Sequence, residues 1–206
     1  MNSPDPIDSG SDLKAVYRQL REFRRGGTEE RLFVRATGHP SDPTGFCFCE
    51  GSLWRLTCFY AKAVFLGLIF RLPCNRLKIW ALRRLGARVG ERVYFSHAVW
   101  IDPTFPELLT IEDGVFFGMG VKVFTHEFRV DEFRAGKVLI RRGAFIGGFA
   151  VIPCGIEIGE DAVVAACCVV YRDVPAGATM VLPQGRLVKR PKNIASEHDR
   201  PEGVRP

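Results

Sequence analysis

The apolar positions in the first part of the chain follow helical spacing in residues 13–25, which predicts an amphipathic helix with a basic opposite face. A second, strongly apolar segment covers residues 53–72. Residues 26–52 between them are rich in Gly, Pro, Thr and Ser, which predicts an irregular connector. Residues 1–12 are expected to be a disordered leader, so residues 13–86 form an N-terminal helical and connector region.

The apolar segment 53–72 is too interrupted to be a convincing membrane span. Arg55 and Lys62 divide it, and its longest uninterrupted stretch, residues 63–70, is far shorter than the ~20 residues that a bilayer requires. Both cations fall on one helical face, so the segment fits a helix lying in a membrane interface. It also fits a helix packed on the main domain. Peripheral membrane contact through residues 53–84 is therefore one of two predictions for this region.

A different period begins at residue 87. Aliphatic or Phe residues recur at every sixth position, with two shifts of frame, at Val89, Phe95, Ile101, Ile111, Phe117, Val123, Ile140, Ile146, Ile152, Ile158, Val164 and Val170. Small residues often follow these anchors, and a second small or aliphatic residue often stands four positions after them. This period is typical of a triangular parallel β-helix in which each hexapeptide forms one side and the anchors point inward. Residues 87–180 are thus predicted to form a mainly β domain of about four coils, after the N-terminal helices and before a basic C-terminal tail at residues 181–206.

The two frame shifts locate segments that leave the repeat. The first adds four residues around residues 107–110, and the second expels residues 127–139 as a polar loop. Binding and catalytic residues are often found on loops that project from a rigid scaffold. The second loop is therefore the expected place for a site.

Composition and charge narrow the classes of partner. Hydrophobic residues make up 47% and charged residues 25%, which excludes a chain disordered throughout. The net charge of +6 favours anionic partners, but the basic residues form no nucleic-acid reading motif, so no nucleic acid is expected. The seven cysteines lack zinc-site spacing and the N-terminus lacks a secretory pattern. We expect a cytoplasmic protein, peripheral at the inner face of the membrane if residues 53–72 bind it.

Four segments carry a resemblance to a known family. They are residues 123–128 (Val-Phe-Thr-His-Glu-Phe), 144–148 (Ala-Phe-Ile-Gly-Gly), 155–161 (Gly-Ile-Glu-Ile-Gly-Glu-Asp) and 169–175 (Val-Val-Tyr-Arg-Asp-Val-Pro). Together they resemble the hexapeptide-repeat acetyltransferases that act on sugars and xenobiotics, the maltose and galactoside enzymes among them. The resemblance implies a left-handed parallel β-helix, a homotrimer with active sites between subunits, and acetyl-CoA as co-substrate. The apolar helix followed by residues 72–78 is similar, more loosely, to members that modify polysaccharides or their lipid-linked precursors.

A catalytic base is needed because a hydroxyl is a poor nucleophile at neutral pH. Of the four histidines, only His126 matches the catalytic position of the family, although it could instead cap a coil through a hydrogen bond. Its other ring nitrogen requires an acceptor, for which Glu127, Asp102 and a backbone carbonyl are all candidates. We assign His126 and Glu127 as catalytic, and a backbone N–H near Gly148 as donor to the oxyanion.

The cofactor-binding candidates follow from the resemblance. Phe145 stands where the family usually has Trp, Tyr171 and Arg172 replace Thr-Lys, and residues 182–185 depart from the family pattern, which places the adenine contacts in doubt. The cofactor-binding candidates are Phe145, Gly148, Ala166, Tyr171, Arg172 and Arg186. The candidates for binding the acceptor are Trp100, Asp102 and Arg134.

The sequence thus predicts an O-acyltransferase, with acetyl as the acyl group by resemblance, acting on a hydroxyl of a sugar or polysaccharide precursor. No metal site is expected, because the repeat offers only His97 and His126, whereas zinc in a related β-helix enzyme class needs three histidines. The alternative is a non-catalytic β-helix that serves as a structural or assembly subunit. Binding of coenzyme A would separate the two.

Overall fold

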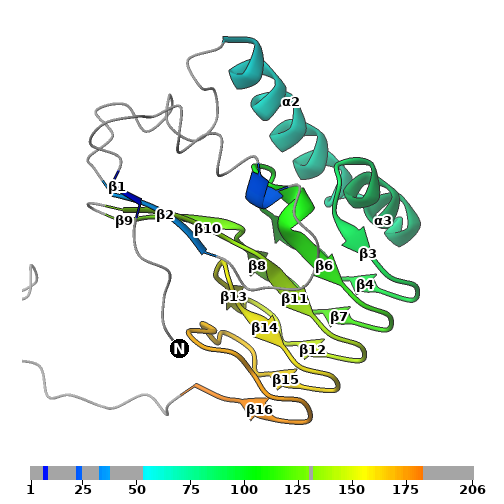
Figure 1. Cartoon of the computed structure of the whole chain (residues 1–206). Helices are drawn as coiled ribbons and strands as arrows, with labels where there is room; N and C mark the ends of the chain where they lie inside the picture. Colours follow the sequence, from blue (N-terminus) through cyan, green and yellow to red (C-terminus); the bar gives the residue numbers. More distant parts are fainter. Residues whose placement is uncertain (1–6, 9–21, 25–32, 38–52, 130–131, 183–206) are drawn as a thin grey trace, which may run out of the picture.

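The computed structural model describes residues 7–8, 22–24, 33–37, 53–129 and 132–182. Its main body is a triangular prism of short parallel strands, stacked coil on coil (Figure 1). Face I contains β3 (Arg88–Val89), β6 (Leu109–Ile111), β11 (Val138–Ile140) and β14 (Glu157–Ile158). Face II contains β4 (Tyr94–Phe95), β7 (Phe116–Phe117), β12 (Phe145–Ile146), β15 (Val163–Val164) and β16 (Thr179–Met180). Face III contains β5 (Trp100–Ile101), β8 (Lys122–Val123) and β13 (Val151–Ile152).

The hexapeptide anchors form the core of the prism, as predicted. All twelve are at most 7% exposed, and the register pairs them directly, as with Phe95 and Phe117 or Ile146 and Val164. The rings of Phe95 and Phe117 stack with their centroids 4.8 Å apart. Each buried anchor contributes about 1.5–3 kcal/mol through the removal of its apolar surface from water. The parallel β-helix is therefore confirmed.

The small residues after the anchors stand against the backbone of the next coil. A Cβ atom added to Gly118 would lie 2.5 Å from the backbone nitrogen of Gly148, and one added to Gly147 would lie 2.4 Å from that of Ala166. Such distances are too short for any side chain. The requirement for a small residue at this position therefore reflects how closely successive coils stack.

Two helices cover the N-terminal end of the prism (Figure 1). They are α2 (Leu53–Ile69) and α3 (Asn75–Arg84), separated by a turn that contains Pro73, a residue that helices rarely continue through. The inner sides of both helices belong to the core, through Leu66, Phe70 and Leu82 among others. Packing on the main domain is thus confirmed. Neither helix, nor any other in the described part of the chain, is long and apolar enough to cross a membrane.

Side chains of α3 pair with the open edge of the first coil. Asn75 donates from Nδ2 to the carbonyl of Val93 at 2.7 Å and accepts at Oδ1 from the N–H of Phe95 at 2.9 Å. Lys78, 3% exposed, donates to the carbonyls of Phe95 and Ser96, and burial lowers the pKa of its ammonium group. Arg83 donates from Nε to the carbonyl of Val89 at 2.8 Å. These side chains satisfy backbone groups that would otherwise lack a partner in a neighbouring coil.

A fourth sheet projects from the prism where the second frame shift was expected. Its order is β1 (Ile7–Asp8), β2 (Phe33–Thr37), β10 (Glu132–Gly136) and β9 (His126–Arg129). The segment predicted as a polar loop at residues 127–139 is instead a hairpin followed by β11, which returns to face I. The expected irregular connector contains β2, and the expected leader contains β1, because pairing with a distant strand outweighs local composition.

Other parts of the N-terminal expectation are only partly described. Residues 22–24 are helical, and the rest of the helix expected at residues 13–25 lies outside the described residues. The tail at residues 181–206 is described only at its first two positions. The first frame shift contains a short 3-10 helix, η2 (Pro106–Leu108), whose Pro106 and Leu108 are buried.

Candidate functional site

His126 and Asp102 lie on successive coils at the corner between faces III and I. Asp102 follows β5 directly, and His126 comes three residues after the end of the strand beneath it, β8. The stacking of β5 on β8 therefore brings the two side chains together, with Nδ1 of His126 2.5 Å from Oδ2 of Asp102. Asp102 is fully buried, and the side chain of His126 is 13% exposed.

The carboxylate of Asp102 is held by further donors. Its Oδ1 atom accepts from the N–H of Thr104 at 2.8 Å, and Oδ2 accepts from the N–H and the hydroxyl of Thr125 at 3.0 and 2.8 Å. Burial alone would raise the pKa of Asp102, but the hydrogen bonds from His126 and Thr104 outweigh it and hold that pKa below its ordinary value. The aspartate is therefore ionised at neutral pH.

An ionised acceptor against Nδ1 determines the form of the imidazole. The proton of neutral His126 then resides on Nδ1, and Nε2 carries the lone pair that can accept a proton. Phe105 packs edge-on against the ring, with the centroids 6.0 Å apart, and so restricts its orientation. An imidazole oriented in this way can accept a proton at Nε2.

Asp102 and Glu127 were given different roles from the sequence, and of the two it is Asp102 that lies against Nδ1 of His126. Asp102 was expected to bind the acceptor, but its buried carboxylate is already held by Thr104, Thr125 and His126. Glu127, expected to be catalytic, lies 3.5 Å from Nη1 of Arg134, an acceptor-binding candidate. Of the acceptors left open for the second ring nitrogen, the Asp102 carboxylate is the one that lies against Nδ1 of His126.

A cavity of about 1150 Å³ opens between α2 and face III, beside His126. Trp100, 40% exposed, lines it and packs on Phe124 with the ring centroids 4.9 Å apart. Glu127 also lines it. The α2 side of this cavity was not expected, because the sequence assigned that helix only to packing or to a membrane. The α2 residues that line it are Phe59, Ala63, Leu66 and Gly67, with Phe70 and Arg71 just after the helix.

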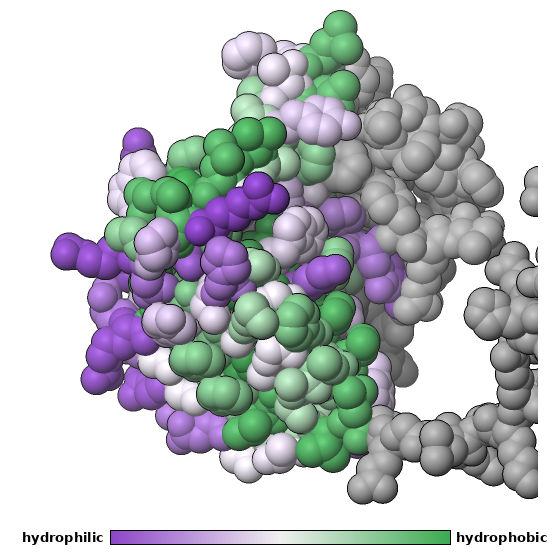
Figure 2. Space-filling model, turned by 180° about the vertical axis from the view of Figure 1, so that it is seen from behind, coloured by the Kyte–Doolittle hydropathy of each residue, from purple (hydrophilic) through white to green (hydrophobic). Residues whose placement is uncertain are grey.

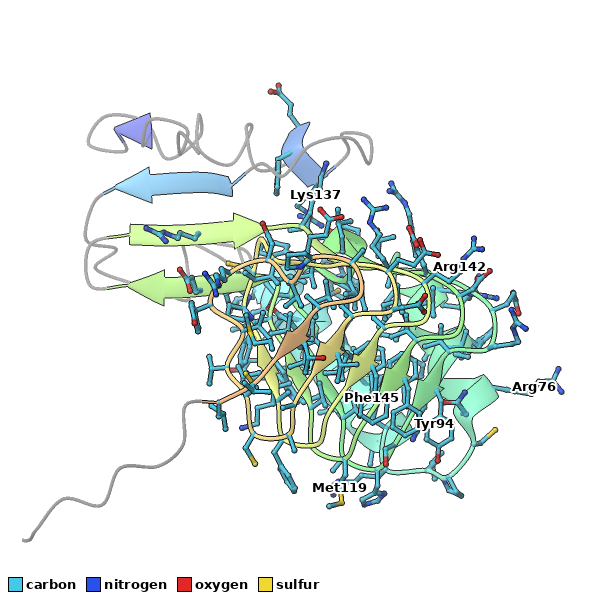
Figure 3. All side chains as sticks on the ribbon, turned by 90° about the horizontal axis from the view of Figure 1, so that it is seen from below. Arg76, Tyr94, Met119, Lys137, Arg142 and Phe145 are labelled. Atoms are coloured by element: carbon cyan, nitrogen blue, oxygen red, sulfur yellow. The ribbon has the colours of Figure 1, made fainter. Side chains whose placement is uncertain are left out.

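The cofactor-binding candidates lie elsewhere on the prism. Phe145 is on face II, where its ring stacks on Phe116 at a centroid distance of 5.0 Å; Phe116 in turn stacks on Tyr94 at 5.1 Å. Phe145 and Tyr94 project from the same face (Figure 3). Gly148 and Ala166 follow β12 and β15 at the corner between faces II and III.

Tyr171 and Arg172 lie at the same corner as His126, further along the prism, with the guanidinium of Arg172 5.7 Å from the centre of the Tyr171 ring. Arg186 lies outside the described residues. One chain therefore brings His126, Asp102, Glu127 and Trp100 together, but it leaves Phe145, Gly148 and Ala166 on a different face and corner.

Within the described ranges, no three His, Cys, Asp or Glu side chains gather in a way that could hold a metal ion.

Comparisons with known proteins agree with this fold. The family model "Bacterial transferase hexapeptide (six repeats)" matches residues 137–172. The Bacillus subtilis (strain 168) protein named "Putative acetyltransferase YvoF" is 34% identical over 134 residues, which cover 62% of this chain and 78% of that protein. A 2,3,4,5-tetrahydropyridine-2,6-dicarboxylate N-acetyltransferase of Staphylococcus aureus (strain JH9) is 37% identical over 60 residues, 29% of this chain and only 25% of the relative.

Solved structures with a similar fold include the hexapeptide-repeat acetyltransferase VCA0836 of Vibrio cholerae, with a TM-score of 0.48, 21% identity, and coverage of 60% of this chain and 85% of that one. A galactoside acetyltransferase in complex with coenzyme A matches with a TM-score of 0.46 and 17% identity. The match covers 78% of this chain and 84% of that protein. The match to YvoF, together with the repeat itself, decides the assignment. This chain belongs to the hexapeptide-repeat acetyltransferases, enzymes built on a left-handed parallel β-helix.

Proposed function

We propose that the protein is an O-acetyltransferase that moves an acetyl group from acetyl-CoA to a hydroxyl of a sugar or polysaccharide precursor, with His126 as general base. The observation that carries the proposal is the 2.5 Å contact between Nδ1 of His126 and the buried carboxylate of Asp102. A structural subunit would have no use for a buried, ionised aspartate whose partner is an imidazole at the mouth of a cavity. The acceptor hydroxyl would then lie in the cavity that His126 lines.

The transfer follows from these positions. Nε2 of His126 removes the proton of the acceptor hydroxyl as its oxygen attacks the thioester carbonyl. The tetrahedral oxyanion then collapses, the carbon–sulfur bond breaks, and the thiolate of coenzyme A takes the proton from His126. Asp102 stabilises the imidazolium that exists between these two proton transfers.

A homotrimer would complete the site. His126 is at the corner between faces III and I, whereas Gly148 and Ala166 are at the corner between faces II and III. In a threefold ring, the His126 corner of one chain could lie beside the Gly148 corner of the next chain. That contact would bring His126 to the proposed cofactor groove. Exposed apolar side chains on and beside faces II and III suit such contacts, whereas face I has the ion pairs of Arg141 with Glu112 and Glu157.

The groove for acetyl-CoA would then run along face II. The stacked rings of Tyr94, Phe116 and Phe145 offer an apolar wall for the pantetheine arm. Exposed Arg172, at the corner that carries His126, suits a phosphate group of the cofactor. Two proteins of similar fold, the Vibrio cholerae acetyltransferase VCA0836 and a galactoside acetyltransferase, were solved in complex with acetyl-CoA and with coenzyme A, respectively.

The helical end of the prism suits peripheral contact with the inner, cytoplasmic face of a membrane. Figure 2 shows hydrophobic residues gathered over this end of the molecule. The large exposed apolar residues of α2 are Leu53, Trp54, Tyr60, Val64, Phe65 and Leu68. Exposed Arg71, Arg76 and Arg84 stand close by in the chain, which would add attraction to anionic lipids.

The test is calorimetric titration with acetyl-CoA, run on the parent and on a His126→Ala variant, followed by thiol release over a panel of sugars. Binding to both proteins, with thiol release only by the parent, is the expected result. Loss of the base should lower kcat by about 10²–10⁴. Absence of acetyl-CoA binding would favour the structural-subunit alternative, and equal thiol release by both proteins would remove His126 from its role.

A further inference from the structure

The cavity beside His126 has an apolar end that a sugar does not need. At about 1150 Å³ it exceeds the roughly 300–1,000 Å³ of ordinary small-molecule pockets. Its polar side chains include Asp102, Thr104, His126 and Glu127, which follow one another closely at one corner of the prism. The wall contributed by α2 is apolar, through Phe59, Ala63, Leu66 and Gly67. A sugar hydroxyl would be recognised at the first end, whereas the side chains of α2 itself offer a sugar no polar partner. Arg71, which also lines the cavity, follows the end of the helix.

Gly67 has no structural reason to be glycine within the described part of the chain. It lies inside α2, where Gly costs about 1 kcal/mol relative to Ala. A Cβ atom added there would meet no atom within 4 Å, so close packing does not exclude a side chain. Gly67 lines the cavity four residues after Ala63, so the two small residues lie on one side of the helix. The missing side chain keeps the groove open.

The groove also lies next to the exposed apolar stripe of α2. Val64 and Leu68, both 60% exposed, each follow a groove residue by one position, a rotation of about 100° around the helix. A long apolar chain that leaves the groove beside Gly67 would therefore pass directly onto this stripe. A short acceptor would fill neither surface.

We infer that this groove holds the alkyl or isoprenoid chain of a lipid-linked sugar, whose hydroxyl is placed at His126. The inference rests on the proposed function, since it names the acceptor class for that same site. His126 fixes the position of the reacting hydroxyl, and the α2 wall fixes the position of the chain. Burial of each methylene of that chain would strengthen binding by a factor of about four, equivalent to ~0.8 kcal/mol.

The test uses two acceptors with the same sugar, octyl β-glucoside and methyl β-glucoside, each kept below any micelle concentration. Binding is measured by calorimetry and transfer by thiol release, for the parent, Gly67→Ala and Gly67→Phe. The parent should bind the octyl compound at least about tenfold more tightly than the methyl compound. Gly67→Ala should keep this preference, and Gly67→Phe should lower the affinity for the octyl compound to the level of the methyl compound.

Several outcomes would overturn the inference. Equal binding of the two acceptors by the parent would do so, as would an equal loss of both in Gly67→Phe, which would indicate a sugar site. Loss of acetyl-CoA binding in Gly67→Phe would assign the groove to the cofactor. The melting temperature of each variant checks that it is folded. It should not fall, because Ala and Phe both favour a helix more than Gly does. The parent could also bind octyl glucoside, and lose that binding in Gly67→Phe, yet release no thiol. That result would support the groove as a site for an apolar chain and would refute the proposed acetyl transfer.

Discussion

Asp102 and His126 are separated by 24 positions in the sequence, yet the carboxylate of one lies 2.5 Å from the imidazole of the other. The contact exists because β5 stacks on β8, so that the residues following each strand occupy the same corner of the prism. A buried carboxylate that also accepts from Thr104 and Thr125 cannot rotate away from the ring. The His126 ring is therefore oriented by the rigid scaffold of the prism.

Replacing Asp102 by Asn should lower kcat by at least about 10²-fold, because an amide N–H against Nδ1 forces the imidazole proton onto Nε2. Glu127→Gln is the matched control, since it also neutralises a carboxylate at the same corner, and it should change kcat by less than about threefold. Thiol-release kinetics on both variants measure this. A larger loss in Glu127→Gln than in Asp102→Asn would return the catalytic role to Glu127.

The stability contributed by Asp102 should depend on pH. Its folded pKa is held below the ordinary value of about 3.9, so the ionised form stabilises the fold at all pH values above that figure. This stabilisation is lost as pH falls below about 3.9 toward the folded pKa. Urea unfolding at neutral and acid pH should show the gap in stability between the parent and Asp102→Asn shrinking on acidification. A gap that widens at low pH would contradict the assignment.

Cysteine reactivity should follow burial. Cys74 and Cys167 are exposed, whereas Cys154 and Cys168 are buried, and burial raises the pKa of the Cys154 thiol to about 12. Because the thiolate is the reactive form, an aromatic disulfide reagent at pH 8 should modify Cys74 and Cys167 in the native protein and Cys154 only after unfolding. Mass spectrometry of the labelled peptides identifies each site. Rapid labelling of native Cys154 would mean that the prism opens at the corner after β13.

Membrane contact should depend on the exposed stripe of α2. The protein is expected to sediment with vesicles that contain anionic lipid, less so at high salt, and a Trp54→Ser, Leu68→Ser double variant should bind about tenfold more weakly or worse. Tyr171→Ser is the control, because Tyr171 is 73% exposed but lies on the prism away from α2. Equal losses in both variants, or no sedimentation of the parent, would refute the contact.

The repeat could be predicted because its period is a direct consequence of the geometry: one side of a coil takes six residues, and each side needs one buried anchor. The same register also contains the pairing of Asp102 with His126. Asp102 stands one residue after the anchor Ile101, and His126 stands three residues after the anchor Val123. The extra residues around η2 concealed it, since they lengthen the separation beyond the three hexapeptides of a regular coil. Asp102 could therefore be named as a candidate partner of His126 but not chosen.

Other features depend on contacts that no local pattern contains. β2 forms in a segment of irregular composition because β10, nearly a hundred residues later, offers a strand to pair with. The cavity depends on how α2 leans over face III, which is decided by the packing of Leu66 and Phe70 in the core. The spacing of apolar residues in α2 predicts a helix and its apolar sides. It does not predict how the helix axis is oriented relative to face III.

The hydrogen bonds from Asn75, Lys78 and Arg83 to the first coil have a consequence for the size of the assembly. Parallel coils stack by the same backbone pairing that joins molecules in amyloid fibrils, and a bare first coil would accept the last coil of another molecule. Open head-to-tail addition of that kind has no natural limit. With this end occupied by α3, addition at the first coil is blocked, which would leave the sides of the prism for the closed ring proposed above.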